Sequence, residues 1–344
     1  MRKKLFKRGV VFGCCLLFVD IGVASTVAET VDDSGLQKLL GDQRVWYYVD
    51  DEPGEGPGNP SEDYIRIQDA IDNASSGDVI FVYSGIYREN IVIRKEIDLL
   101  GESRFSTIID AYNPRIPGVF INSSNVTVKR FTIKNSSEAS GILIQEKIQK
   151  IRYITIQECD IKNNGGNGVS LDGALLKPPG IEKRSIPSID SVIIHGCRIT
   201  NNGGNGVYSQ EADVERITSC NISDNRGNGI HIESSPVTIM MENHIERNGR
   251  CGIYIKGSHT AWLGIVFVQE NHIANNAEEG LHFADYALAV FVNRNTFSEN
   301  NKRGYQLVAD LYGPPPLPWY VHNNQWEPKK FYARLWRIIR LPCS

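Results

Sequence analysis

The sequence lacks a charge excess of either sign, with 37 basic and 40 acidic residues among 344 and a net charge of −3. This balance gives no electrostatic reason to expect nucleic-acid binding. The chain also has no apolar run of 18 or more residues free of charge, which excludes a multi-spanning membrane protein. With 41% hydrophobic and only 22% charged residues, it has enough apolar material for a large core, so global disorder is excluded too.

The first 28 residues have the pattern of an export signal, although an uncleaved membrane anchor remains an alternative. A basic start, Arg2 to Arg8, precedes the apolar stretch Gly9–Val19, and Thr26-Val27-Ala28 is typical of a cleavage site. Residues 29–61 are expected to form a linker and an N-terminal loop, since Trp46 to Ser61 is rich in Gly, Pro and acidic residues. Cleavage would leave five of the seven cysteines, so at least one thiol would be unpaired within the chain.

The middle of the chain repeats with a short period. Equivalent positions step from residue 159 to 197, 220, 243, 271 and 295, so the intervals are 38, 23, 23, 28 and 24 residues. A unit near 23 residues is too short for two helices, and its alternating apolar positions between Asn/Gly turns favour three short strands. One such unit cannot bury its own apolar face, so the units must stack. We therefore expect an all-β solenoid, a single-stranded parallel β-helix with rungs about 4.8 Å apart.

The period predicts two ladders of identical or similar side chains. The first is inward-facing and consists of Cys159, Cys197, Cys220, Asn243, Asn271 and Asn295. Its three cysteines allow a soft-metal or redox site, but the column has no histidine and the chain has no Cys-x-x-Cys pair. Buried, inert thiols followed by a hydrogen-bonded asparagine ladder are therefore the favoured interpretation. The second ladder lies at a turn and is interpreted as structural: Asn164, Asn202, Asn225, Asn248, Asn276 and Asn300.

Both ends of a solenoid need caps. Residues 62–76 have partial helical spacing and predict an N-terminal helical cap, followed by the first strands at Val79–Val82 and Ile91–Ile93. The β-helix with this cap is expected to span residues 62–326. Residues 327–344 are basic and aromatic, and are expected to form a capping tail rather than a contact with an acidic partner.

Several segments at the start of this region resemble the opening of the pectin lyase-like superfamily of right-handed β-helix proteins: Ile67-Gln68-Asp69-Ala70-Ile71, Gly77 to Val82, Gly85 to Asn90 and Leu100-Gly101-Glu102. The later Asn-Gly repeats resemble its NosD-type and generic β-helix repeats. The resemblance covers about residues 45 to 326 and implies a right-handed coil. It does not imply an activity, because the superfamily includes lyases, hydrolases, esterases, epimerases and non-catalytic proteins. The family's usual catalytic signatures have no convincing match in the central repeats.

One outward column has the composition of a binding surface. The residues between the two apolar positions after the repeat glycine are Ser170, Tyr208, His231, Tyr254, His282 and Gln306. Two residues further on, the same strands carry Asp172, Gln210, Glu233, Lys256, Ala284 and Val308. We expect Tyr208, His231, Tyr254, His282, Gln210 and Trp262, which lies in a following loop, to bind ligand. Aromatic faces beside polar groups suit sugar rings, although Tyr and His are also common on half-exposed strands.

Two functions remain open from these observations. The first is an exported, non-catalytic β-helix protein, secreted or at the cell surface, with a structural role or a polysaccharide or cell-surface glycan as partner. The second is a polysaccharide lyase or glycoside hydrolase, with Asp172 and Glu233 as weak catalytic candidates about 10 Å apart. No cofactor and no metal is predicted, since His231 and His282 lie two rungs apart and cannot easily share a copper ion. Nucleic acid is not expected as a partner, and a membrane only through an uncleaved signal segment.

Overall fold

The computed structural model describes residues 44–52, 64–145, 150–173, 175–176, 186–233, 237–257, 265–285, 289–301, 306–311 and 320–327. The expected signal segment 1–28, the loop residue Trp262 and the tail beyond residue 327 lie outside these ranges. Within them, no helix has the length and apolar character needed to cross a bilayer.

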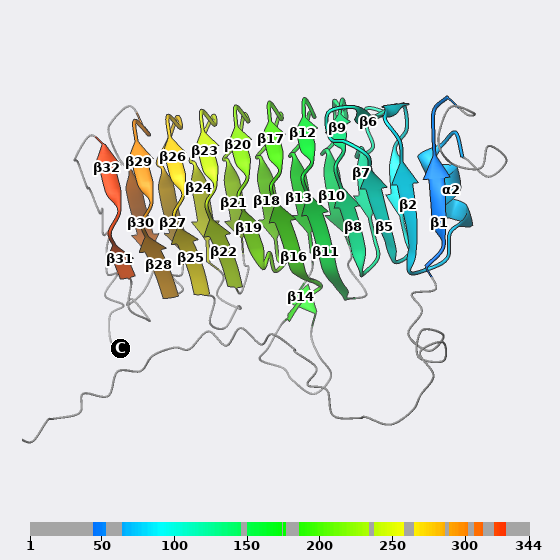
Figure 1. Ribbon diagram of the computed structural model, residues 1–344. Coiled ribbons are helices and arrows are strands. Elements are labelled where there is room, and N and C mark those ends of the chain that lie inside the picture. The colour runs from blue at the N-terminus through cyan, green and yellow to red at the C-terminus, as the bar shows by residue number, and fades with distance from the viewer. Residues whose placement is uncertain are drawn as a thin grey trace, which may run out of the picture. The chain divides into compact units, whose positions relative to one another are not determined.

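The described chain winds through three parallel sheets in turn, one short strand in each per rung (Figure 1). A central rung consists of β16 (Ile189–His195), β17 (Arg198–Thr200) and β18 (Val207–Gln210). Each of these strands pairs in parallel with its equivalents in the preceding and following rungs. The expected parallel β-helix is therefore confirmed. Among the described residues, antiparallel pairing occurs between β14 (Leu175–Leu176) and β15 (Ile186–Pro187), which lie in the long insertion after β13.

The three sheets are named here by their strands. Sheet A contains β1 (Trp46–Val49), β2 (Asp78–Val82), β5 (Ile97–Gly101), β8 (Val126–Lys129), β11 (Ile151–Gln157), β16, β19 (Arg216–Thr218), β22 (Val237–Met241), β25 (Ile265–Gln269), β28 (Ala289–Asn293) and β31 (Tyr320–His322). Sheet B contains β3 (Gly85–Tyr87), β6 (Thr107–Asp110), β9 (Thr132–Lys134), β12 (Asp160–Lys162), β17, β20 (Asn221–Ser223), β23 (His244–Glu246), β26 (His272–Ala274), β29 (Thr296–Ser298) and β32 (Gln325–Glu327). Sheet C contains β4 (Ile91–Ile93), β7 (Val119–Ile121), β10 (Ile142–Gln145), β13 (Val169–Asp172), β18, β21 (Ile230–Glu233), β24 (Ile253–Lys256), β27 (Leu281–Asp285) and β30 (Leu307–Leu311).

Stacked aliphatic side chains fill the interior of the coil. The column on sheet B is typical, and all its members are fully buried: Ile161, Ile199, Ile222, Ile245, Ile273 and Phe297. The column ends with Phe297 stacked on Trp326 at a ring-centroid distance of 4.5 Å. Because each side chain packs on its equivalents above and below, no single repeat can be stable alone.

The two predicted ladders also lie inside the coil. Cys159, Cys197 and Cys220 are buried free thiols, and Asn243, Asn271 and Asn295 continue their column. The Nδ2 group of Asn243 donates to Oδ1 of Asn271 at 2.9 Å, and Asn271 donates to Asn295 at 2.9 Å. The second ladder, expected at a turn, is buried as well, and its amides likewise bond from rung to rung. The asparagine side chains of both ladders therefore provide hydrogen-bond partners for the buried amide and backbone groups in the interior of the coil.

The backbone explains why asparagine and glycine alternate in the turns. The left-handed conformation falls on the residue before each asparagine of the two ladders, for example Asn201 with φ 56° and Asp224 with φ 58°. Asn and Asp tolerate this region better than most residues. The repeat glycine is needed for a different reason, which is close packing. A Cβ at Gly229 would lie 2.5 Å from Cγ2 of Ile245 and 2.6 Å from the oxygen of Gly252.

The N-terminal cap is the short helix α2 (Ile67–Asn73), which lies at one end of the coil and packs against β1, β2 and β4 (Figure 1). The carboxylate of Glu89 accepts hydrogen bonds from the backbone N–H groups of Ile67 and Gln68, at 2.9 and 3.1 Å. These are donors at the helix start that have no partner within the helix. Glu89 thus fixes the cap to the first rung, which gives this residue of the segment Gly85 to Asn90 a structural role.

The structure corrects two expectations. Trp46–Val49, expected in an N-terminal loop, forms β1 and pairs in parallel with β2, so the sheet begins earlier than residue 62. In the last repeat, Leu307 pairs with Leu281 and Val308 with His282, which moves Gln306 out of the outward column. Gln306 is fully buried and accepts a 2.7 Å hydrogen bond from Asn300, so it ends the buried ladder. Val308 was expected to pair with Ala284, but the residue that pairs with Ala284 is Asp310.

Candidate functional site

The predicted outward column lies on the outer face of sheet C, and its residues are neighbours in space. The strand register places Ser170 beside Tyr208, Tyr208 beside His231, His231 beside Tyr254 and Tyr254 beside His282. Ser170 is buried, whereas the four aromatic side chains are partly exposed. We call Tyr208, His231, Tyr254 and His282 the ring row. Trp262, expected beside it, lies outside the described residues.

Adjacent rings in the ring row meet edge to face. The centroids of Tyr208 and His231 are 5.1 Å apart with planes at 78°, and those of His231 and Tyr254 are 4.8 Å apart at 65°. Tyr254 and His282 follow at 5.1 Å and 62°. Because neighbouring planes are tilted so far from parallel, the rings do not bury their faces in one continuous stack. Such a row can offer both ring faces and ring edges to a ligand.

A polar row runs beside the ring row, two residues further along each strand. Its polar members in rung order are Asp172, Gln210, Glu233 and Lys256, and Ala284 occupies the same position in the next rung. The Tyr208 hydroxyl donates to Oε1 of Gln210 at 2.9 Å, and Lys256 forms a 2.6 Å ion pair with Glu233. Gln145 donates to the carboxylate of Asp172. The row therefore presents amide, carboxylate and ammonium groups at successive rungs, alongside aromatic rings.

On the other side of the ring row lies a third line of side chains, which occupies the position before each repeat glycine. These residues are Asn167, Asn205, Asn228, Cys251 and Glu279. Oδ1 of Asn205 accepts from the backbone N–H of Asn228 at 2.8 Å, and Oδ1 of Asn228 accepts from that of Cys251 at 3.0 Å. The line also supports the ring row, since Asn228 lies 3.3 Å from Nδ1 of His231 and Glu279 lies 3.4 Å from Nδ1 of His282.

Burial and neighbouring charges shift the protonation of two groups in the ring row. Burial, together with the carboxylates of Glu233 and Asp172, raises the pKa of Tyr208. Burial lowers the pKa of His231, and the nearby cations Lys256 and Arg250 act in the same direction against the opposing carboxylate of Glu233. The neutral forms of both side chains are therefore favoured at neutral pH. Neutral Tyr and His side chains hydrogen-bond uncharged hydroxyl groups.

The two weak catalytic candidates are held by other side chains. Asp172 and Glu233 are separated by the rung of Gln210, as predicted, so they lie about 10 Å apart, beyond the spacing usual for an inverting carboxylate pair. Asp172 accepts a hydrogen bond from Gln145 and Glu233 is paired with Lys256. This arrangement gives neither carboxyl group the apolar surroundings that favour a general acid.

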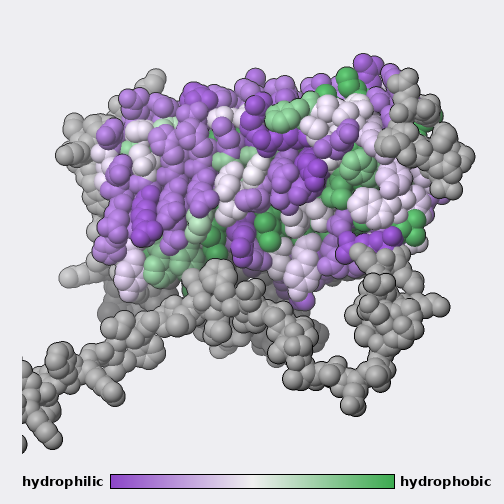
Figure 2. All heavy atoms as spheres, in the orientation of Figure 1, coloured by the Kyte–Doolittle hydropathy of each residue, from purple (hydrophilic) through white to green (hydrophobic). Residues whose placement is uncertain are grey.

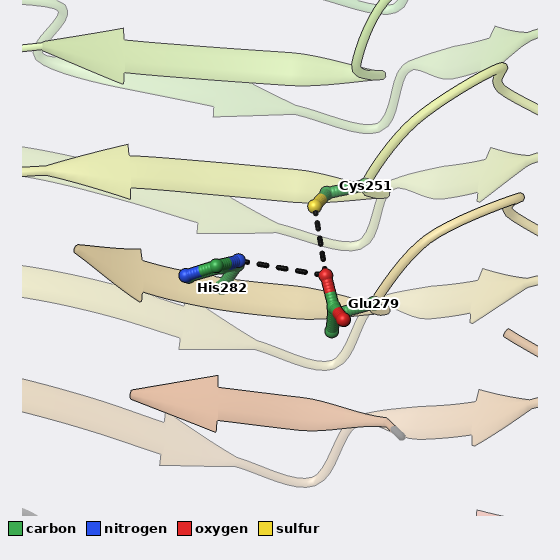
Figure 3. A group of neighbouring side chains, drawn as sticks. All are labelled: Cys251, Glu279 and His282. Atoms are coloured by element: carbon green, nitrogen blue, oxygen red, sulfur yellow. Dashed lines mark hydrogen bonds and ion pairs between the residues drawn. The ribbon is translucent and has the colours of Figure 1, made fainter. Parts of the chain in front are cut away.

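A group that the sequence analysis missed lies at the end of the ring row. Cys251, Glu279 and His282 each direct one metal-ligating atom to the same place, and these atoms all lie within 4.8 Å of one another (Figure 3). Cys251 begins the rung of β24, whereas Glu279 and His282 belong to the next rung. Burial raises the pKa of Cys251, and the carboxylates of Glu279 and Glu278 act in the same direction. The repeat alignment contained the signal, because Cys251 and Glu279 occupy the same position in consecutive repeats.

The remaining exposed faces differ from the ring row. On sheet A, Phe267, Phe291 and Tyr320 stack in parallel, with centroids 4.9 and 5.0 Å apart and planes within 12°. Their faces are turned to one another, so this stack offers ring edges outward. The view of Figure 2 shows hydrophilic residues over most of one side of the coil, with apolar residues in separate patches. The interior thiols take no part in any exposed group, and burial raises the pKa of Cys159 and Cys197.

Comparisons with known proteins agree with this architecture. Residues 117–312 match the family model described as "Right handed beta helix region". A segment of 108 residues is 32% identical to a cell surface glycoprotein of Methanothermus fervidus, and this match spans 31% of the chain and 16% of the glycoprotein. Among solved structures, the A-module of the mannuronan C-5 epimerase AlgE4 of Azotobacter vinelandii has a TM-score of 0.50 at 14% identity, covering 81% of this chain and 100% of the module. ORF18 of Geobacillus virus E2 has a TM-score of 0.49 at 13% identity, covering 84% of this chain and 66% of ORF18.

Proposed function

Because the chain belongs to the family of right-handed parallel β-helix proteins, whose fold carries both enzymes and binding proteins, we propose that it is an exported, non-catalytic protein that binds a polysaccharide at the ring row. The observation that carries the proposal is the unbroken series Tyr208, His231, Tyr254 and His282 beside the polar row. A location outside the cell or at its surface is supported by the basic-apolar N-terminal segment and by the similarity to a cell surface glycoprotein.

The geometry fits an extended sugar chain. Successive rungs lie about 4.8 Å apart, which is close to the length of one sugar unit, so a chain lying along the coil would meet equivalent rings and polar groups at regular intervals. The rings contact the apolar faces of sugars, and Gln210, Glu233 and Lys256 provide donors and acceptors for hydroxyl groups. The presence of Lys256 and of two carboxylates allows either a neutral or a charged polysaccharide.

A lyase or hydrolase on the same strands is the second hypothesis. It shares the surface but needs a carboxyl group free to transfer a proton. The hydrogen bond to Asp172 and the ion pair of Glu233 favour binding over catalysis.

A polysaccharide panel tests the proposal. The full chain is screened by affinity electrophoresis against alginate, polygalacturonate, xylan, mannan and glucan, and the same mixtures are assayed for reducing ends and unsaturated products. We expect binding without turnover, and loss of binding in Tyr208→Ala and Tyr254→Ala. Tyr112→Ala is the matched control, since Tyr112 is 80% exposed and lies away from the ring row. Turnover that disappears in Glu233→Gln or Asp172→Asn would establish the enzymatic hypothesis instead. Failure to bind any member would leave a structural role at the surface.

A further inference from the structure

We propose that Cys251, Glu279 and His282 form a zinc-binding site at the edge of sheet C, with three protein ligands and one position open to water or to an oxygen of a ligand. The proposal does not depend on polysaccharide binding. It rests on the donor set, on the distances between the donor atoms and on the contacts that hold Glu279 in place.

The distances fit a tetrahedral ion. Sγ of Cys251 lies 3.4 Å from Oε2 of Glu279, and the same Oε2 lies 3.4 Å from Nδ1 of His282. Zinc bonds of about 2.3 Å to sulfur and about 2.0 Å to nitrogen or oxygen, at tetrahedral angles, place neighbouring donor atoms about 3.3–3.5 Å apart. The third pair, sulfur and nitrogen, is within 4.8 Å and closes by small rotations of the two side chains. Figure 3 shows Glu279 between the other two side chains.

The chemistry of the donors selects the ion. A thiolate is a soft ligand, an imidazole suits zinc, and one carboxylate completes a mixed set that is unlike the all-oxygen sites of calcium and magnesium. Glu278 adds a second acidic group, with its Oε2 3.6 Å from Sγ of Cys251. When zinc binds, the Cys251 thiol loses its proton to solvent and the thiolate bonds to the ion. Without the ion, the Cys251 thiol keeps its proton and donates a hydrogen bond to the carboxylate of Glu279.

The surroundings position the ligands in advance. Asn301 donates a 2.9 Å hydrogen bond to Oε1 of Glu279, which leaves Oε2 directed at Cys251 and His282. The main chain of Cys251 is fixed by its bond to Asn228. Cys251 itself is 1% exposed, whereas the side chains of Glu279 and His282 are each 18% exposed, so the open position can be reached from solvent. Such outer contacts are typical of metal sites, whose ligands need fixed orientations.

A metal titration tests the site. The full chain is dialysed against EDTA and titrated with zinc chloride by calorimetry, and then with cobalt chloride by absorption spectroscopy. We expect one zinc per chain, release of about one proton per zinc, and a thiolate-to-cobalt charge-transfer band. Calcium and magnesium chloride should not compete.

Substitutions identify the ligands. Cys251→Ser should abolish the charge-transfer band, and Glu279→Gln and His282→Gln should each weaken zinc binding more than tenfold. His322→Gln, at an exposed position in β31 on sheet A, is the matched control and should bind zinc as the unaltered chain does. Glu279→Gln and His282→Gln change partly exposed groups, so they keep the test decisive if Cys251→Ser fails to fold. Absence of zinc uptake by the unaltered chain, or equal uptake by all three variants, would overturn the proposal.

Discussion

The side chain of Asn225 donates a 3.1 Å hydrogen bond to Oδ1 of Asn248, which occupies the same position one rung further along the coil. The same oxygen also accepts from the backbone N–H of Asn225 at 3.2 Å. Each asparagine of this ladder from Asn202 to Asn300 satisfies two donors of the rung before it in the same way. Its own amide donates to the interior carbonyl of an isoleucine, Ile222 in the case of Asn248. The ladder therefore links the successive rungs from Asn164 to Asn300 through groups that have no access to water.

Replacing one member of this ladder should destabilise the fold. Asn248→Ala leaves the amide of Asn225, its backbone N–H and the carbonyl of Ile222 without these bonds. Buried groups without a partner cost about 1–3 kcal/mol each, so we expect a loss of about 3 kcal/mol or more in the free energy of unfolding. Urea denaturation followed by circular dichroism measures it. Asn221→Ala, an exposed asparagine at the start of β20, is the matched control. An equal effect of both substitutions would contradict the role assigned to the ladder.

Two of the interior cysteines, Cys159 and Cys197, should be unreactive in the native protein. Cys159 and Cys197 are buried and their pKa values are raised, so they carry almost no reactive thiolate at neutral pH. We expect iodoacetamide to leave both residues unlabelled for hours in buffer and to label both within minutes in denaturant. Peptide mapping by mass spectrometry distinguishes these thiols from the others. Rapid native labelling at either position would show that the column opens to solvent.

Tyr208 should contribute to glycan binding mainly through its ring. Tyr208→Phe loses the hydrogen bond to Gln210 but retains the apolar faces, so binding should fall only a few-fold. Tyr208→Ala removes the ring, and an aromatic residue that is important for binding contributes about 2 kcal/mol, or about 30-fold in affinity. Calorimetry with the polysaccharide found in the panel measures both. If the phenylalanine variant lost as much affinity as the alanine variant, the hydroxyl group would be the main contact.

Stability should decrease in mild acid because of His231. Its pKa is lowered in the folded protein by burial, whereas the unfolded chain takes up the proton near pH 6.5. Below that pH the unfolded state binds more protons at this residue, so the free energy of unfolding falls as the pH is lowered towards the folded pKa. We expect the urea midpoint to drop less between pH 7.5 and 5 in His231→Gln than in the unaltered chain. Burial also lowers the pKa of His272, and this contribution to the pH dependence is present in both His231→Gln and the unaltered chain.

The control for this pH experiment is His322→Gln, at an exposed position in β31. This variant measures how far the replacement of a water-exposed histidine by itself alters the pH response. Parallel pH curves for His231→Gln and the unaltered chain would contradict the prediction.

Asn301 should act on zinc through Glu279. Asn301→Ala removes the hydrogen bond that orients the carboxylate, and losses of such outer contacts typically weaken metal binding by about 10–100-fold. The cobalt charge-transfer band should persist, because the thiolate ligand is unchanged. Competition with a chromophoric zinc chelator measures the affinity. Loss of both the band and the affinity in this variant would indicate that the local fold is disrupted, and would contradict a role for Asn301 in orienting Glu279.

Much of the fold was predictable because it repeats. The intervals between residues 159, 197, 220, 243, 271 and 295 predicted the rungs, and the alternation after each repeat glycine predicted that Tyr208, His231 and Tyr254 share one outward column. The prediction failed where the repeat ends: the last rung is shifted by two residues, so that Gln306 is buried and Val308 takes the outward place. The strand at Trp46–Val49 was missed because its sequence precedes the repeats and acquires its partner, β2, only in the folded chain.

The sequence by itself determined the coil and its columns, since a short period of alternating apolar residues can bury its apolar face only by stacking. The tertiary structure alone decided which polar atoms meet. Cys251 lies 28 residues from Glu279, and their approach depends on side-chain orientation at a turn, where Asn301 holds one carboxylate oxygen and frees the other. Periodicity specifies neighbouring rungs, but only the packed side chains specify the distance between a thiol, a carboxylate and an imidazole.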